Sequence, residues 1–141
     1  MDIGLWTLLL DDAPAGGFDK HKVGVFGVAF KGGTDDLRDS PGLAIVEQLL
    51  KEKARVVIFD PLVNKQALKS YVERGAEVAI SFLSALEMVN VCIVASNAPE
   101  FAQIEKLNGQ FKKRIKIIDG RRFLKMPING TGEYFAIGRS I

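Results

Sequence analysis

Apolar and polar positions along the chain follow two alternating patterns. Short apolar runs rich in β-branched residues predict six buried strands, at residues 22–28, 55–59, 77–80, 91–95, 115–118 and 134–137. The stretches between most of these runs place apolar residues at helical spacing. They predict helices at residues 40–51, 65–73, 81–89 and 99–107.

Strands that alternate with helices predict the α/β class. The expected architecture is a doubly wound, mostly parallel sheet of five to six strands with helices on both faces, a Rossmann-like three-layer sandwich. The run 91–95 is the most apolar strand and should lie at the centre of the sheet. Ser40 followed by Pro41 is typical of a helix start, and Ser81 is a second candidate N-cap.

The breaker-rich segment 12–17 divides the chain into two parts. Residues 1–19 are interpreted as an apolar N-terminal stub and linker, and residues 20–141 as one domain. The stub cannot form a core alone. It is either a docking segment or the remaining end of a longer chain, and the second interpretation is favoured because Trp6 among leucines needs a partner surface.

Composition narrows the function classes. The chain has 141 residues, of which 48% are hydrophobic and 26% charged, a globular balance that excludes disorder as the main state. The formal net charge of +2 is too small to indicate a nucleic-acid partner. One cysteine and one histidine exclude an internal disulfide and make a metal site improbable. No run reaches the roughly 18 apolar residues of a membrane span, and a cytoplasmic location is expected by default.

Polar residues follow the predicted strands. They occur in segments 29–39, 60–61, 96–98 and 119–122. Ligands of doubly wound sheets bind at the carboxyl ends of the strands, so these segments should line the site. Lys31 and Arg121 would flank the crevice and suit an anionic ligand such as a phosphate.

Several residues near this edge have simpler interpretations. The segment from Gly24 fails the GxGxxG dinucleotide pattern, which argues against NAD binding here. Asp60, before a proline, is expected to cap or turn the next element rather than to hold a ribose. Asp36 and Arg38 are expected to order their loop by ion pairing and hydrogen bonds. Cys92, inside a strand, is expected to be a small core residue and not a nucleophile.

The segment 27–41, GVAFKGGTDDLRDSP, resembles the signature of the UDP-glucose/GDP-mannose dehydrogenase family in its C-terminal UDP-binding domain, G-x-A-F-K-x-x-T-D-D-x-R-x-S-P. Three further segments agree with this resemblance: VIFDP at 57–61, IDGRR at 118–122 and YFAIGR at 134–139. The resemblance covers residues 20–141.

The resemblance implies a substrate-binding role. Whole enzymes of this family oxidise the C6 hydroxyl of a nucleotide sugar such as UDP-glucose to a carboxylate in two NAD-dependent steps. They combine an NAD-binding domain, a central dimerisation domain and this C-terminal domain. The resemblance places Phe30, Lys31 and Arg121 on the substrate, Phe30 through its backbone and the two cations on phosphate or sugar oxygens. With Asp36 and Arg38, Ser40 is expected to order the loop.

The catalytic motif is missing from the sequence. The family's catalytic thiol lies in a glycine-flanked, proline-containing motif that this chain lacks, so no catalytic residue is assigned. We expect the chain alone to bind a nucleotide sugar weakly or not detectably, to bind no NAD and to oxidise nothing. NAD would act only in the full-length enzyme. The alternatives are a stand-alone regulatory module that senses a nucleotide, and an ordinary NAD-binding Rossmann domain.

Overall fold

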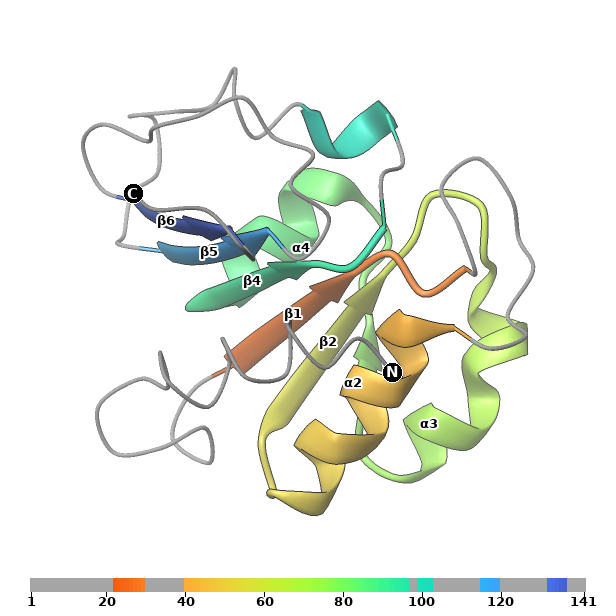
Figure 1. The fold of residues 1–141 in the computed structure, drawn as a ribbon. Helices are drawn as coiled ribbons and strands as arrows, with labels where there is room; N and C mark the ends of the chain where they lie inside the picture. Colours follow the sequence, from red (N-terminus) through yellow and green to blue (C-terminus); the bar gives the residue numbers. More distant parts are fainter. Residues whose placement is uncertain (1–21, 30–39, 97–98, 103–114, 120–131, 137–141) are drawn as a thin grey trace.

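The computed structural model describes residues 22–29, 40–96, 99–102, 115–119 and 132–136. Six strands form one sheet in the order β3-β2-β1-β4-β5-β6, and every neighbouring pair is parallel (Figure 1). The strands are β1 (Lys22–Phe26), β2 (Arg55–Phe59), β3 (Glu77–Val78), β4 (Val91–Val94), β5 (Ile115–Asp119) and β6 (Gly132–Ala136). The predicted α/β class and doubly wound sheet are confirmed.

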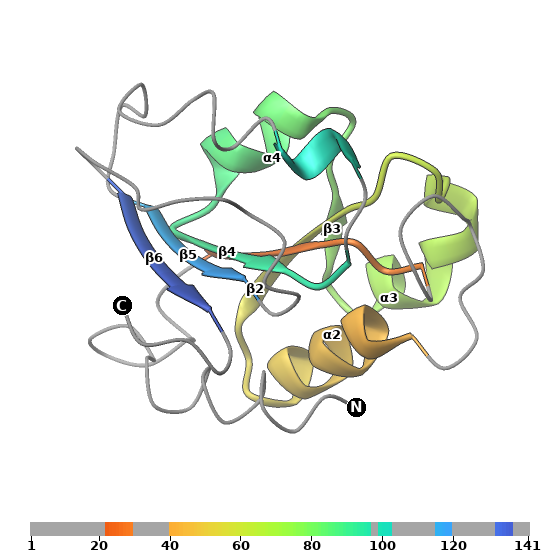
Figure 2. The same cartoon turned by 45° about the horizontal axis from the view of Figure 1, so that its top comes forward.

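Helices cover both faces of the sheet. Figure 2 shows α2 (Pro41–Lys51) and α3 (Lys69–Glu73) on one face and α4 (Phe82–Met88) on the other. Two apolar clusters fill the two interfaces, because successive side chains of a strand point to opposite faces. In β4 all four residues are buried, as expected for an interior strand of a parallel sheet. The central position predicted for this strand is therefore confirmed.

The two serine caps lie where the sequence predicted them. Ser40 Oγ accepts a hydrogen bond from Leu43 N at 3.1 Å, and Pro41 occupies the first turn of α2. Ser81 Oγ accepts from Ser84 N at 3.1 Å and begins α4. Each cap satisfies one backbone N–H group that the first helical turn leaves without a partner.

The lengths of other elements differ from the prediction. The helix expected at 65–73 divides into a 3-10 turn, η2 (Lys65–Leu68), and α3, because Asn64 Oδ1 accepts from Ala67 N and begins a tight turn. The strand expected at 77–80 keeps two residues, since it pairs with β2 at the sheet edge over two positions only. The helix expected at 99–107 begins as a 3-10 turn, η3 (Pro99–Ala102), and its remainder lies outside the described residues.

Four phenylalanines form one cluster on the α4 face of the sheet. Phe26 and Phe59 end β1 and β2, while Phe82 and Phe101 come from α4 and η3. The ring centroid of Phe26 lies 5.8 Å from Phe59, 5.7 Å from Phe82 and 5.8 Å from Phe101, at tilted or edge-on angles. Such geometry stabilises aromatic pairs beyond the burial of their area. The cluster therefore anchors the carboxyl ends of two strands to the helical layer.

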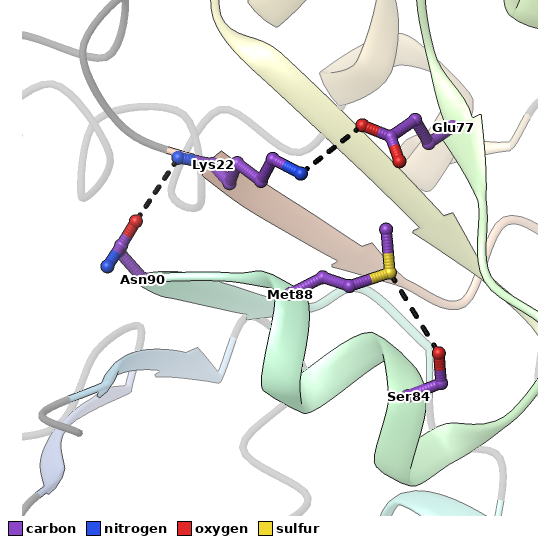
Figure 3. A network of polar contacts seen from close by, with 5 residues as sticks. All are labelled: Lys22, Glu77, Ser84, Met88 and Asn90. Carbon is purple, nitrogen blue, oxygen red and sulfur yellow. Dashed lines mark hydrogen bonds and ion pairs between the residues drawn. The ribbon is translucent and has the colours of Figure 1, made fainter. Parts of the chain in front are cut away.

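The opposite, amino edge of the sheet carries polar contacts between side chains (Figure 3). Lys22 N donates to Asn90 Oδ1 at 3.4 Å, and Lys22 Nζ lies 3.4 Å from Glu77 Oε1. The side chains of Lys22 and Glu77 are 33% and 51% exposed, so their ion pair contributes little to stability. These contacts join residues at the amino ends of β1 and β3 with Asn90, which precedes β4.

Gly42 permits a close approach between α2 and the end of β1. A Cβ atom at this position would lie 2.1 Å from the carbonyl oxygen of Gly27 and 3.0 Å from the Cα of Val28. Both neighbours are backbone atoms, which cannot rotate away as a flexible side chain can. The first turn of α2 therefore sits directly against the chain that leaves β1.

We predict that Gly42→Ala destabilises the fold by about 1–3 kcal/mol through this overlap. Helix propensity alone would give the opposite sign, since alanine is favoured over glycine within a helix. Urea unfolding followed by circular dichroism measures the difference, with Gln48→Ala on the same helix as a control that stays within about 0.5 kcal/mol of the parent. An equally stable or more stable Gly42→Ala variant would contradict the close approach.

Candidate functional site

The carboxyl ends of four strands lie in register. Phe26 pairs with Phe59 on one side and with Val94 on the other, and Val94 pairs with Asp119. The segments that begin at residues 27, 60, 95 and 120 therefore leave the sheet at one edge. Strands are spaced by about 4.8 Å, so the ends of β1 and β5 lie about 10 Å apart.

The strand order reverses between β1 and β4. From β1 the chain proceeds outward through β2 to β3, then crosses back to β4 on the other side of β1. A doubly wound sheet forms its binding crevice at this reversal, outside the carboxyl ends of the strands. The candidate site is therefore the edge above β1 and β4.

Asp60 ties the end of β2 to the chain leaving β1. Its Oδ2 accepts hydrogen bonds from Val28 N at 2.9 Å and from Ala29 N at 3.1 Å. Its Oδ1 accepts from Leu62 N at 3.0 Å, which is the turn role predicted for this residue. The bonds from Val28 N and Ala29 N to Asp60 were not predicted, because they join residues about thirty positions apart and no local pattern indicates them.

Ser40 contacts the same short segment from the other direction. Its Oγ donates to the carbonyl oxygen of Val28 at 2.5 Å while accepting from Leu43 N. Ser40 is buried, as are Val28 and Ala29. The two ends of segment 30–39 are thus joined by a hydrogen bond at the sheet edge.

Ser40 alone among the predicted site residues belongs to the described part of the chain. Phe30, Lys31, Asp36, Arg38 and Arg121 lie outside the described residues. Their attachment points are described: Ala29 immediately precedes Phe30, and Asp119 is two positions before Arg121.

Cys92 lies in the middle of β4 and is completely buried in the cluster on the α4 face. The interpretation of this cysteine as a core residue is confirmed.

Ser96 lies at the reversal point, in the segment 96–98 that the sequence places at this edge, but the burial of its hydroxyl was not predicted. It follows β4, is 2% exposed, and its Oγ has no hydrogen-bond partner among the residues that the structure describes. A Cβ on Gly27 would lie 2.1 Å from this hydroxyl, and the positive φ of Gly27, 101°, also favours glycine. A buried hydroxyl without a partner costs free energy, so it needs an explanation. Its position directly after a central strand is the one signal that could have indicated it.

A hollow of about 480 Å³ opens beside the ends of β2 and β3. Its lining combines the aromatic residues Phe59 and Phe82 with the polar residues Asp60, Lys65, Ser81 and Glu100. Three large apolar side chains nearby in the sequence are exposed: Leu62, Ile80 and Leu83. The carboxyl edge therefore carries apolar as well as polar surface.

Within the described ranges, no three His, Cys, Asp or Glu side chains gather as a metal site would require. None of the described helices has the length and apolar character needed to cross a bilayer.

Comparisons with known proteins relate the sequence of this chain to a protein family. Residues 24–126 match the model of the "UDP-glucose/GDP-mannose dehydrogenase family, UDP binding domain". The chain is 34% identical over 106 residues to the UDP-glucose 6-dehydrogenase AglM of Haloferax volcanii. That alignment covers 75% of this chain and 24% of the relative.

Solved structures show the same relation. A UDP-glucose dehydrogenase from Pyrobaculum islandicum aligns over 97% of this chain with a TM-score of 0.71 and 25% identity. A UDP-D-ManNAc dehydrogenase from Pyrococcus horikoshii aligns over 98% with a TM-score of 0.70 and 29% identity. The chain covers 29% and 30% of these two proteins, so it spans less than a third of the length of its relatives. The match of the family model over residues 24–126, most of the domain, shows that this chain belongs to the UDP-glucose/GDP-mannose dehydrogenase family, as its UDP-binding domain.

Proposed function

We propose that this chain is the nucleotide-sugar-binding domain of an NAD-dependent nucleotide-sugar 6-dehydrogenase, which oxidises UDP-glucose-type substrates to uronic acids. The observation that carries the proposal is the shared register of β1, β4 and β5 at their carboxyl ends. Because of this register, the segments that contain Lys31 and Arg121 begin at the same edge of the sheet, and their first residues are about 10 Å apart. A diphosphate between two cationic side chains fits that separation, because both side chains are long and flexible.

The domain is proposed to hold the substrate while other polypeptide performs the oxidation. Lys31 and Arg121 would bind the phosphate or sugar oxygens, and Phe30 would contribute backbone contacts. The NAD-binding and central dimerisation domains would lie in the remainder of a longer protein, since the chain covers 24% to 30% of the relatives described above. This division would leave the isolated domain with weak affinity for the substrate.

The described residues do not fit a dinucleotide. The GxGxxG pattern belongs to the turn after the first strand, and counted from Gly27 its second glycine position is Ala29, whose N–H is already bound to Asp60. The acidic residue that would bind a ribose corresponds to Asp60, and both of its carboxylate oxygens accept bonds from backbone N–H groups. These two observations disfavour the alternative of an ordinary NAD-binding domain.

We predict that Lys31→Ala and Arg121→Ala each weaken nucleotide-sugar binding by about 1.5–3 kcal/mol, the contribution of a hydrogen bond to a charged group. Titration of the ¹⁵N-labelled chain with millimolar UDP-glucose, followed by amide shifts, measures the affinity. Lys51→Ala is the matched control, because it removes one positive charge at the far end of α2. If both variants bind like the parent, the assignment of these cations is wrong.

The isolated chain is predicted to produce no NADH from UDP-glucose and NAD. Cys92 is enclosed in β4, and no other cysteine is present to serve as the thiol that the family resemblance implies. Absorbance at 340 nm with the purified chain tests this directly. Steady NADH formation by the parent chain would contradict the prediction. If the formation persisted in a Cys92→Ala variant, a residue other than Cys92 would perform the chemistry.

Ser96→Ala is predicted to change stability and affinity in opposite directions. Removing a buried hydroxyl that lacks a partner should stabilise the ligand-free fold by about 1 kcal/mol. We expect Ser96 Oγ to form a hydrogen bond with the bound nucleotide sugar, so the same change should lower the affinity for UDP-glucose. The control Ser81→Ala removes a hydroxyl that caps α4 and should destabilise the fold by a similar amount. Thermal unfolding and the amide-shift titration measure both properties, and lower stability with unchanged affinity would contradict this assignment.

A further inference from the structure

We propose that Asp60 is a positioning residue, which holds the backbone from which Phe30 and Lys31 extend and so aligns them for the nucleotide sugar. The inference rests on the proposed function and adds to it a residue outside the loop signature. It gives Asp60 a role across two strands, beyond the local turn at the end of β2.

The contacts of Asp60 concentrate on two consecutive N–H groups. Oδ2 accepts from Val28 N and Ala29 N at 2.9 and 3.1 Å, while Oδ1 is occupied by Leu62 N. Asp60 is only 9% exposed, so these bonds are shielded from water. Hydrogen bonds to an ionised carboxylate are roughly twice as strong as neutral ones. Asp60 is therefore a stronger restraint on this segment than a neutral side chain would be.

Neighbouring contacts fix the same segment from other sides. Gly27 N donates to the carbonyl oxygen of Phe59 at 2.8 Å, and Ser40 Oγ donates to that of Val28 at 2.5 Å. Three consecutive residues, 27–29, thus each have a backbone group bound to a side chain or strand of another element. Of these contacts, the bond from Ala29 N to Asp60 Oδ2 lies nearest in sequence to Lys31.

The restraint lies close enough to act on Lys31. Ala29 and Lys31 are two residues apart, so their Cα atoms are separated by at most about 7 Å whatever the conformation between them. Loss of the Asp60 bonds would let the Val28 and Ala29 peptide groups reorient. A change at that point moves the origin of the Lys31 side chain, and displacements of about 1 Å are enough to weaken a charged contact markedly.

The experiment compares Asp60→Ala and Asp60→Asn with Asn64→Ala. Asn64 Oδ1 also accepts a backbone N–H bond, from Ala67, but this contact is exposed and local to the start of η2. Two quantities are measured on the ¹⁵N-labelled chain: the UDP-glucose affinity by amide-shift titration, and the hydrogen-exchange rates of the Val28 and Ala29 amides. Both are recorded at a temperature at which each variant is fully folded.

Asp60→Ala is expected to weaken UDP-glucose binding roughly tenfold. It should also accelerate exchange at Val28 and Ala29 relative to the amides of β4. Asp60→Asn should fall between Ala and the parent, because an amide side chain has one acceptor oxygen where the carboxylate has two. Asn64→Ala should lose some stability and keep its affinity. If Asp60→Ala does not fold, the comparison of Asp60→Asn with Asn64→Ala decides the question.

Two outcomes would overturn the inference while leaving the proposed function intact. One is unchanged affinity in the Asp60 variants despite faster exchange at Val28 and Ala29. The other is an affinity loss in Asn64→Ala equal to that in the Asp60 variants, which would mean that affinity follows general stability. Both proposals need weak but measurable binding, so a parent chain that shows no shifts even with UDP-glucose raised to its solubility limit would overturn the proposed function and the positioning role together.

Discussion

Parallel pairing in register is the constraint on which this domain depends. Because Phe26, Phe59, Val94 and Asp119 end their strands on one line, four connections emerge together on one edge. The strand order reverses at β1 and β4, so the connection after β1 leads towards β2 and the connection after β4 leads towards β5. A doubly wound sheet forms its crevice between two such connections. A slip of one residue in β1 would exchange the faces of its side chains and place Val25 in the aromatic cluster instead of Phe26. The candidate site and the core are thus set by the same register.

The core and the edge use different physical interactions. The two faces of the sheet are closed by aliphatic and aromatic packing, and Cys92 belongs to that packing. At the carboxyl edge three of the buried residues are polar: Ser40, Asp60 and Ser96. Two of them satisfy backbone groups of the chain leaving β1, and the third has a hydroxyl without a partner. Polar groups buried at an edge restrict the backbone there more than apolar packing would, since hydrogen bonds are directional.

The sequence predicted most of the fold and part of the candidate site. Apolar runs and serine caps are local signals, and Ser40 and Ser81 begin their helices where expected. The prediction of one α-helix over 65–73 was wrong in its first half, because Asn64 begins a tight 3-10 turn in a sequence whose spacing also suits an α-helix. The second role of Asp60 was beyond local patterns, since one oxygen accepts from Leu62 nearby and the other from Val28 and Ala29, in the chain that leaves β1. The missing partner of Ser96 could emerge only once strand neighbours were known. Lys31 and Arg121 were predicted from their positions after the strands and again from the resemblance, and Phe30 from the resemblance alone; all three stay predictions.

The hydrogen bond from Ser40 to Val28 has a consequence for how such domains diversify. It closes the segment between them into a loop whose two ends meet at a point belonging to the framework. Lengthening a closed loop costs little chain entropy, about 0.6 kcal/mol for each doubling. Changes of sequence between these ends therefore cost the sheet little stability, so the strict spacing of the signature at 27–41 is not a requirement of the sheet.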